Sequence, residues 1–295
     1  MGKSAYLSHH LTTMSKNQTL GSLSIVGVIS AGLRIYRDHF KSYFNIALQA
    51  YCWSIVPIYG WAKCLALSAL ISRLAYYETL EQPEVISEAR SRVEPRMWSF
   101  LGQGLLVALI LMGGILGLVL VWVISFGLVL AISGEDNAII YLIGFAFFIA
   151  IVFAYIGLVS RLFIASLPLA VEDNMTATAA IILSWNLTKG SVFRIQGILF
   201  LGFLIILPFS ILLLFIVVFL QLYLAFIVST DSSTYHLVVN LFSVAINIII
   251  GALFLPFWQS IAGVIYYDLK VRQEGISLKT NPMDSIPYYE YEDDL

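Results

Sequence analysis

Long apolar runs alternate with short polar junctions along this chain. Four of the runs are nearly free of charge, and they span residues 98–132, 138–169, 196–228 and 237–267. Each is longer than the about 20 residues that a helix needs to cross the hydrocarbon core of a bilayer. We therefore expect four membrane-crossing helices, whose surplus length is absorbed by tilt, by kinks or by extension into the interface.

A fifth apolar run, at residues 43–80, is too long for one ordinary crossing and is interrupted by the sequence PIYGWAK. Within it, Pro57 and Gly60 are residues typical of turns, and Lys63 is charged. Basic residues gather on both flanks of the run, so the positive-inside rule places both ends in the cytoplasm and requires an even number of crossings. We predict two short helices with a hairpin between Pro57 and Gly60. A single crossing of residues 43–80 is the alternative.

The remaining junctions divide by charge in the same way. Residues 133–137 (SGEDN) and 229–233 (STDSS) contain acids but no Lys or Arg, which is typical of outer loops. Residues 170–195 and the segment after the last run contain Lys and Arg, which indicates that both face the cytoplasm. The predicted fold is all-α and polytopic, with six transmembrane helices in three hairpins and both termini cytoplasmic. The expected divisions are a polar tail at 1–22, a membrane domain at 23–275 and a disordered acidic tail at 276–295.

Three cytoplasmic junctions resemble one another, at residues 28–44, 85–100 and 178–193. Each has small and apolar residues at helical spacing, then basic residues, then aromatic residues. We expect an amphipathic helix at the membrane interface before each hairpin, whose basic side chains meet anionic lipid at about 1 kcal/mol per residue. The interfacial basic residues are Arg34, Arg37, Arg90, Arg92 and Arg96. The alternative is that the three junctions are similar only because each precedes a hairpin of the same architecture, and that they have no specific lipid- or ligand-binding role.

Composition agrees with a membrane protein and excludes an ordinary soluble domain. Hydrophobic residues make up 60% of the 295 positions and charged residues 12%. The formal net charge of -2 gives no indication of a nucleic-acid partner. The two cysteines, Cys52 and Cys64, are too few and too far apart in sequence to indicate a zinc site or a disulfide-bonded scaffold.

Catalytic and metal-binding patterns are not found in the sequence. The four histidines, His9, His10, His39 and His236, are not connected by HxxxH or HExxH spacing. There is no Walker loop, Rossmann glycine set or GxSxG elbow. We expect no catalytic residue, no metal and no cofactor, and therefore a protein that is not an enzyme.

Ionisable residues near the cytoplasmic helix ends are the better candidates for a binding site. Charged groups at membrane depth pair with one another or face a cavity, so we expect a cytoplasmic cluster that includes Arg161, Glu172, Asp268 and Arg272. The predicted lipid- or ligand-binding set is Arg161, Glu172, Trp185, Lys189, Arg194, Asp268 and Arg272. The alternative is a set of ion pairs that tie the helix ends together.

Three amides lie within the apolar runs, at Gln221, Asn240 and Asn247. An unpaired amide in hydrocarbon is unfavourable, so each needs a partner. Hydrogen bonds between helices are one use for them, and a polar transport path is the other.

Three stretches form an ordered set of motifs: RLFIASLPLAVE (161–172), AIILSWNLTKG (180–190) and YYDLKVRQEG (266–275). Together they resemble the glycerophosphodiester phosphodiesterase membrane-domain family, and the similarity covers about residues 23–275. The resemblance implies a six-helix protein of the bacterial inner membrane. In members that hydrolyse glycerophosphodiesters the chemistry belongs to a separate soluble barrel domain, so we expect none of that activity from this chain.

The favoured hypothesis is a non-enzymatic membrane protein that organises lipids or partner proteins through a basic cytoplasmic face. Its expected partners are anionic membrane lipids, with a membrane-protein partner or a second copy as further possibilities. The alternatives are a transporter or flippase of a small amphiphile or lipid, a subunit of a larger membrane complex, and a lipid phosphodiesterase. Substrate, oligomeric state and the choice between plasma and internal membrane do not follow from the sequence.

Overall fold

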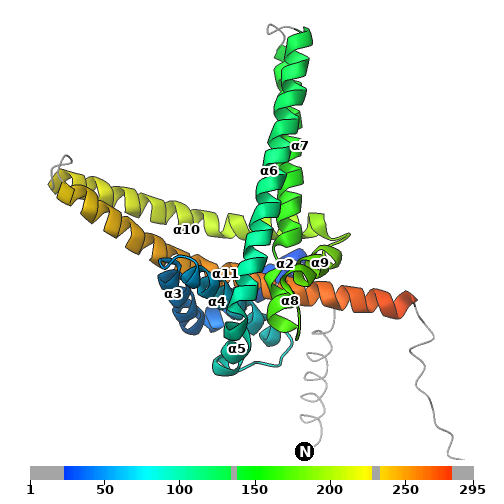
Figure 1. Ribbon diagram of the computed structural model, residues 1–295, viewed down its shortest axis with the longest axis vertical. Coiled ribbons are helices and arrows are strands. Elements are labelled where there is room, and N and C mark those ends of the chain that lie inside the picture. The colour runs from blue at the N-terminus through cyan, green and yellow to red at the C-terminus, as the bar shows by residue number, and fades with distance from the viewer. Residues whose placement is uncertain (1–22, 134–137, 228–232, 281–295) are drawn as a thin grey trace, which may run out of the picture.

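The computed structural model describes residues 23–133, 138–227 and 233–280, and these residues form helices and the turns that join them (Figure 1). The predicted tail at 1–22 lies outside the described residues, as do residues 281–295 of the tail predicted at 276–295. Residues 276–280, expected to be part of that disordered tail, belong to the last helix. In chain order the helices are α2 (Ile25–Asp38), α3 (Phe40–Ser54), α4 (Tyr59–Thr79), α5 (Ile86–Val93), the 3-10 helix η1 (Glu94–Arg96), α6 (Met97–Ser133), α7 (Ala138–Leu162), α8 (Ser166–Val171), α9 (Ala177–Leu187), α10 (Val192–Ile227) and α11 (Ser233–Thr280).

Two long helix pairs project from a common base of shorter helices (Figure 1). We call α6 with α7 the first arm, and α10 with the first half of α11 the second arm. The two arms extend in different directions, and the second half of α11 runs through the base. The junctions expected outside the cell, 134–137 and 228–232, are outside the described residues, but the helix ends that flank them lie far from the base.

Among the described residues, four helices are long and apolar enough to cross a membrane, judged by length and composition. They span residues Ile86–Ala131, Ile139–Val171, Val192–Tyr223 and His236–Gln273. No more than 17% of the most apolar window of any of them is buried within the protein. The four clear apolar runs of the sequence are therefore long helices whose outer surfaces the chain itself does not cover.

The helix α7 ends at Leu162, earlier than the apolar run that predicts it. Pro168 explains the break, because a proline removes a backbone donor and its ring clashes with the carbonyl four residues earlier, here that of Ile164. A turn at residues 163–165 follows, and Pro168 falls in the first turn of the new helix α8 (Ser166–Val171), where proline is tolerated.

The apolar run at 43–80 forms two helices, α3 and α4, that pack against each other. The turn between them lies at residues 55–58, slightly before the expected position, so Gly60 is already helical. A side chain at Gly60 would place its Cβ 1.8 Å from the Trp53 carbonyl oxygen, which explains the need for glycine. Neither helix is among the four that are long and apolar enough to cross.

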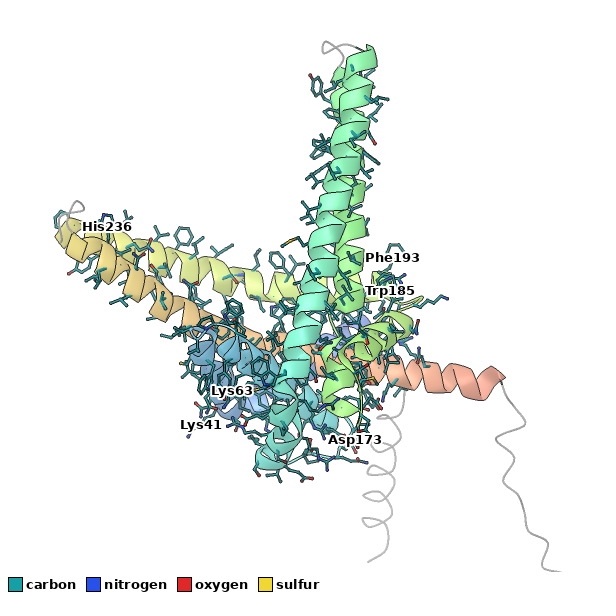
Figure 2. All side chains as sticks on the ribbon, in the orientation of Figure 1. Lys41, Lys63, Asp173, Trp185, Phe193 and His236 are labelled. Carbon is teal, nitrogen blue, oxygen red and sulfur yellow. The ribbon has the colours of Figure 1, made fainter. Side chains whose placement is uncertain are left out.

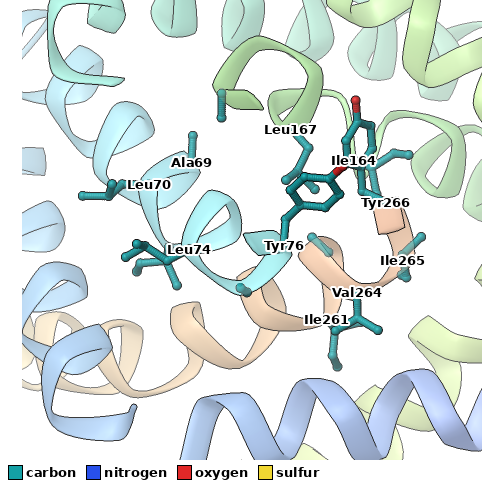
Figure 3. Packing of buried hydrophobic residues seen from close by; sticks show 14 of the residues in the cluster. Ala69, Leu70, Leu74, Tyr76, Ile164, Leu167, Ile261, Val264, Ile265 and Tyr266 are labelled. Atoms are coloured by element: carbon teal, nitrogen blue, oxygen red, sulfur yellow. The ribbon is translucent and has the colours of Figure 1, made fainter. Parts of the chain in front are cut away.

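The hydrophobic core lies in the base, around α4 and the inner half of α11 (Figure 3). On α4, Leu70 and Ile71 have no exposed surface, and Ile261 and Val264 of α11 are equally buried. Fully burying one such side chain contributes about 1.5–3 kcal/mol. The helices approach closely because Gly263 lacks a side chain, and a Cβ there would lie 2.8 Å from the Ser72 carbonyl oxygen.

The short helix α2 packs its apolar face against protein, whereas the sequence predicts a helix that lies along the membrane interface. Its buried residues are Val28, Ile29, Gly32 and Ile35. This face packs on α11, where a Cβ at Gly32 would lie 3.2 Å from the backbone of Ile261. The apolar stripe of α2 is thus buried against protein, and its N-terminus is capped by Ser24, whose Oγ accepts a hydrogen bond from Gly27 N.

Gly263→Ala is expected to lower the free energy of unfolding by about 1–3 kcal/mol, because its Cβ would clash with the backbone of α4. The matched control is Gly113→Ala in α6, where nothing lies within 4 Å of a Cβ and the change should stay within about 1 kcal/mol. Both can be measured by thermal unfolding in detergent, monitored by circular dichroism. Equal stabilities for the two variants would contradict the close packing of α4 and α11.

Candidate functional site

Three of the predicted site residues meet at Asp268, whose side chain is 3% exposed. Arg194 Nη1 lies 2.8 Å from Asp268 Oδ2 as an ion pair, and Arg272 Nε donates to the same oxygen over 3.0 Å. The backbone N–H of Leu23 donates to Asp268 Oδ1 over 2.7 Å, and both arginines donate to the Leu23 carbonyl oxygen. This Asp268 centre joins the start of α2, the start of α10 and the inner part of α11.

A second centre forms around Glu172, just after α8. Its Oε1 accepts hydrogen bonds from Lys270 Nζ at 2.5 Å and from the Tyr266 hydroxyl at 3.1 Å. Arg96 donates to the carbonyl oxygens of Glu172 and Met175, at 3.0 and 2.6 Å. The Glu172 centre therefore ties α11, the end of α8 and η1 together.

The pKa of the Glu172 carboxyl is lowered from its ordinary value. Burial, the largest single influence, raises this pKa, but it is outweighed by the hydrogen bond and charge of Lys270 together with the hydrogen bond from Tyr266. The ionised form is thus favoured in the folded protein, which makes Glu172 a structural anion at neutral pH.

A third ionic contact was missed by the sequence interpretation. The Arg73 side chain is 3% exposed and pairs bidentately with Glu84, with Nε–Oε2 and Nη2–Oε1 distances of 2.7 and 2.9 Å. Arg73 also donates to the Ala170 carbonyl oxygen and lies 4.9 Å from the centre of the Tyr77 ring. The signal was available, because an arginine within an apolar helical segment needs a buried partner.

The interfacial basic residues fall into two groups. Arg90 donates to Gln49, Arg92 pairs with Glu88 and approaches Glu84, and Arg96 is held by the two carbonyls of the Glu172 centre. Arg34 and Arg37 are exposed, and the only ion pair of Arg37 within the described residues is a 3.4 Å contact with Asp38 next to it. Exposed pairs of this kind contribute little to stability, so these cations remain available to a partner.

Arg161 is not part of a cluster with Glu172. Its guanidinium lies over the Trp185 ring, with the carbon 4.3 Å from the ring centre, and no carboxylate of the described residues forms an ion pair with it. The Ser184 hydroxyl donates to the Arg161 carbonyl oxygen over 2.7 Å, which holds α9 against the end of α7. Lys189, in the turn after α9, is exposed and has no ion pair with a described residue. Arg161 and Trp185 are therefore brought together, separately from the two acidic centres.

An open cleft of about 780 Å³ lies between α7 and the start of α10, beside Arg161. Small residues make it: Ala146, Ala150, Ala154 and Gly157 share one face of α7 at helical spacing. The opposite wall includes Val192, Phe193 and Gln196 of α10, and Arg161 also lines the cleft. Figure 2 shows Trp185 and Phe193 near each other, beside the inner part of α7.

Gln196 carries a buried polar atom that lacks a partner. Its residue exposure is 8%, and its Nε2 donates to the Phe153 carbonyl oxygen over 3.1 Å. Its Oε1 accepts no hydrogen bond from any described residue. Buried polar atoms without partners are rare in folded proteins and point to a missing water or ligand.

The intramembrane amides lie in the second arm. Gln221 and Asn247 line a groove of about 520 Å³ between α10 and α11, together with Ser210 and Ser243. Asn247 Nδ2 donates to the Ser243 carbonyl oxygen over 2.7 Å, within its own helix. Asn240 is exposed and does not line this groove.

Within the described residues, no group of three or more His, Cys, Asp or Glu side chains could hold a metal ion. His39 lies 3.3 Å from Glu78 and stacks on Tyr43, and His236 lies at the far end of the second arm (Figure 2). His9 and His10 are outside the described residues. The expectation of no catalytic residue stays a prediction.

Comparison of the chain with protein-family models, with curated proteins and with solved structures finds no match. The resemblance to glycerophosphodiester phosphodiesterase membrane domains stays a prediction. The charge arrangement, the exposed apolar arms and the cleft beside Arg161 are the observations from which a function can be inferred.

Glu172→Gln is expected to lower the melting temperature near pH 7 by about 2–4 °C, because it removes the charge that pairs with Lys270. The pKa of Glu172 is lowered in the folded state, so this stabilisation is present above the ordinary carboxyl pKa and is lost as pH falls through the folded-state pKa. The difference between wild type and variant should therefore shrink in acid. Thermal unfolding from pH 7 to pH 3 measures it, with Glu88→Gln as the exposed control. A difference independent of pH would exclude the charge of Glu172 as its cause.

Proposed function

We propose that this chain is a non-enzymatic integral membrane protein that organises anionic lipids or partner proteins through a basic cytoplasmic face. The carrying observation is the exposed apolar surface of the arms, where no more than 17% of the most apolar window in any candidate span is buried. Phe145 and Phe215, for example, are 64% and 69% exposed. Surfaces of this extent are stable only when lipid or another membrane protein covers them.

The distribution of cations supports the orientation. Residues 97–160 and 195–269 contain no Lys or Arg, so the described outer parts of both arms carry no basic residue. Figure 2 shows Lys41 at the base and His236 at the far end of the second arm. A negative cytoplasmic leaflet attracts such residues by about 1 kcal/mol each. These observations support our proposal that the base lies on the cytoplasmic side.

The number of crossings is proposed to be even, with α3 and α4 as a third inserted hairpin beside the two arms. The tip of this hairpin exposes Ile55, Val56, Ile58 and Trp61, which favours an apolar environment. The 15 residues of α3 extend about 22 Å, which is shorter than the about 30 Å of the hydrocarbon core. Six crossings therefore need a locally thinned bilayer. The other even number is four, in which only the tip of the α3–α4 hairpin enters the membrane. Both keep the two termini in the cytoplasm.

The family resemblance, and with it a bacterial inner-membrane location, belongs to the same proposal. The partner part is supported by α6, where Gly113 and Gly117 have nothing within 4 Å of a built Cβ. Glycines four residues apart on an exposed membrane helix allow a second helix to approach closely. A membrane-protein partner or a second copy would fit there.

Transport of a small amphiphile is less well supported. The groove with Gln221 and Asn247 meets, at Phe254, a smaller pocket of about 280 Å³ that leads toward α2. Apart from Tyr36, that inner pocket is lined by apolar side chains such as Leu33 and Phe257. Within the described residues, the groove therefore does not continue as a polar path to the base.

The topology can be tested by cysteine labelling in a Cys52→Ser, Cys64→Ala background. We expect Gly134→Cys and Asp231→Cys to react with a membrane-impermeant maleimide only from outside the cell, and Lys189→Cys only from the cytoplasmic side. Ile58→Cys, at the apolar tip, should be protected from the cytoplasmic side. Labelling of Ile58→Cys from the cytoplasm would show that the α3–α4 hairpin is not inserted.

Lipid organisation can be tested with the exposed cations. The triple variant Arg34→Gln, Lys41→Gln, Lys189→Gln should reduce the anionic share of co-purified lipid by roughly twofold or more, because three attractive charges are lost. Lipid mass spectrometry of polymer-extracted protein measures this share, and Lys63→Gln, whose side chain lies over Trp53 at the hairpin, is the control. The effect should weaken at high salt, which shortens the screening length. A wild-type lipid shell with the bulk composition would remove the lipid part of the proposal.

A further inference from the structure

We propose that the cleft between α7 and the start of α10 binds one anionic phospholipid, with its phosphate at Arg161 and an acyl chain along the small-residue face of α7. This inference rests on the proposed membrane location and names one specific ligand site within it. Four observations carry it, and they concern shape, charge, an unsatisfied amide and the aromatic border.

The shape fits an acyl chain. Ala146, Ala150, Ala154 and Gly157 leave a hollow along α7 where larger side chains would fill the space, and Phe153 forms part of its apolar wall. Its volume of about 780 Å³ falls in the range of ligand pockets, and its lining is mostly apolar. The residues that line it belong to α7, to α10 or to the turn before α10, so no other described helix contributes to its wall.

The charge fits a phosphate. Of the described residues, Arg161 is the one ionisable residue that lines the cleft, and its side chain donates no hydrogen bond to another of them. The cation–π contact with Trp185 uses the charge of the guanidinium but none of its N–H donors, so these donors remain available to a ligand. A guanidinium edge matches the paired oxygens of a phosphodiester.

The lining also selects among phospholipids. No carboxylate lines the cleft, so the ammonium group of a zwitterionic headgroup would have no counter-charge there. The Oε1 of Gln196 lacks a donor, and a hydroxyl-bearing headgroup or a water bound with it can supply one after a small shift of the amide. These features favour an anionic headgroup with hydroxyls, for which phosphatidylglycerol is the probe.

The border of the cleft matches the interface depth. Phe193 is 80% exposed and Trp185 41% exposed, and both lie beside the inner end of α7 (Figure 2). Aromatic residues prefer the headgroup region, where a lipid phosphate also lies. Lys189 and Gly190, in the turn between α9 and α10, lie next to this border, and Gly190 adopts a φ of 83° that the turn requires.

The test is a titration of delipidated full-length protein with phosphatidylglycerol, followed by native mass spectrometry. We expect one tightly retained molecule, about tenfold or more weaker binding in Arg161→Gln, and no change in Arg34→Gln, which removes an exposed cation elsewhere. Arg161→Lys should recover binding only in part, because it keeps the charge but loses the paired donors. Ala150→Leu, which fills the cleft without touching a charge, should also weaken binding. Melting temperatures of all variants verify that they are folded.

A second readout reports on position. In a variant that keeps only Trp185 of the six tryptophans, phosphatidylglycerol brominated on its acyl chain should quench the fluorescence more strongly than the phosphatidylcholine analogue. Equal binding of both lipids, displacement by millimolar inorganic phosphate alone, or full binding by folded Arg161→Gln and Ala150→Leu would each overturn the proposal. If Arg161→Gln and Ala150→Leu bind normally while the Arg34, Lys41 and Lys189 triple variant still loses its anionic lipid, the specific site is wrong and the general lipid role stands. If Arg161→Gln and Ala150→Leu lose binding while the triple variant keeps its anionic lipid, the general role is wrong and the specific site stands.

Discussion

The buried carboxylate of Asp268 is the contact on which the arrangement of the base depends. It lies between Arg194 and Arg272 and also accepts the backbone N–H of Leu23, so one anion joins three segments that are far apart in sequence. Burying a charge is unfavourable unless it is paired, and removal of one partner from such a pair typically costs about 3–5 kcal/mol. Because α2, α10 and α11 all meet at this carboxylate, it fixes where the second arm leaves the base.

The arms need no comparable centre. A helix satisfies its own backbone hydrogen bonds, so α6 and α10 can remain helical where their side chains contact only lipid. Contacts between the helices of the first arm are local, as where Trp122 Nε1 donates to the Gly144 carbonyl oxygen over 3.2 Å. Packing and ion pairs are concentrated in the base, where α4 and the inner half of α11 bury one another. The protein therefore combines a packed base with apolar arms that depend on their surroundings.

Sequence patterns predict the elements of this fold better than their contacts. Length and hydropathy are properties of one segment, and they indicate the four long helices and the turn near Pro57. Hydropathy alone does not predict that α7 ends at Leu162. The end is explained by Pro168, whose ring would clash with the Ile164 carbonyl if the helix continued. Pairings such as Arg73 with Glu84, or Arg161 with Trp185, depend on how α9 and the loop after α4 fold back, and no periodicity in the sequence carries that information.

The arginines near the base fall into two groups by their contacts. Arg73, Arg96, Arg194 and Arg272 donate to carboxylates or to backbone carbonyls at helix ends, so each guanidinium is held by contacts within the protein. Arg161 is stacked on Trp185 and faces a hollow lined by small residues. Folded proteins fill such hollows in their own interior, since an empty space loses dispersion contacts on every side. A hollow that stays open beside a guanidinium without an ion pair supports our proposal that a ligand fills it from outside, and in a bilayer the abundant molecule with a negative end and an apolar chain is a phospholipid.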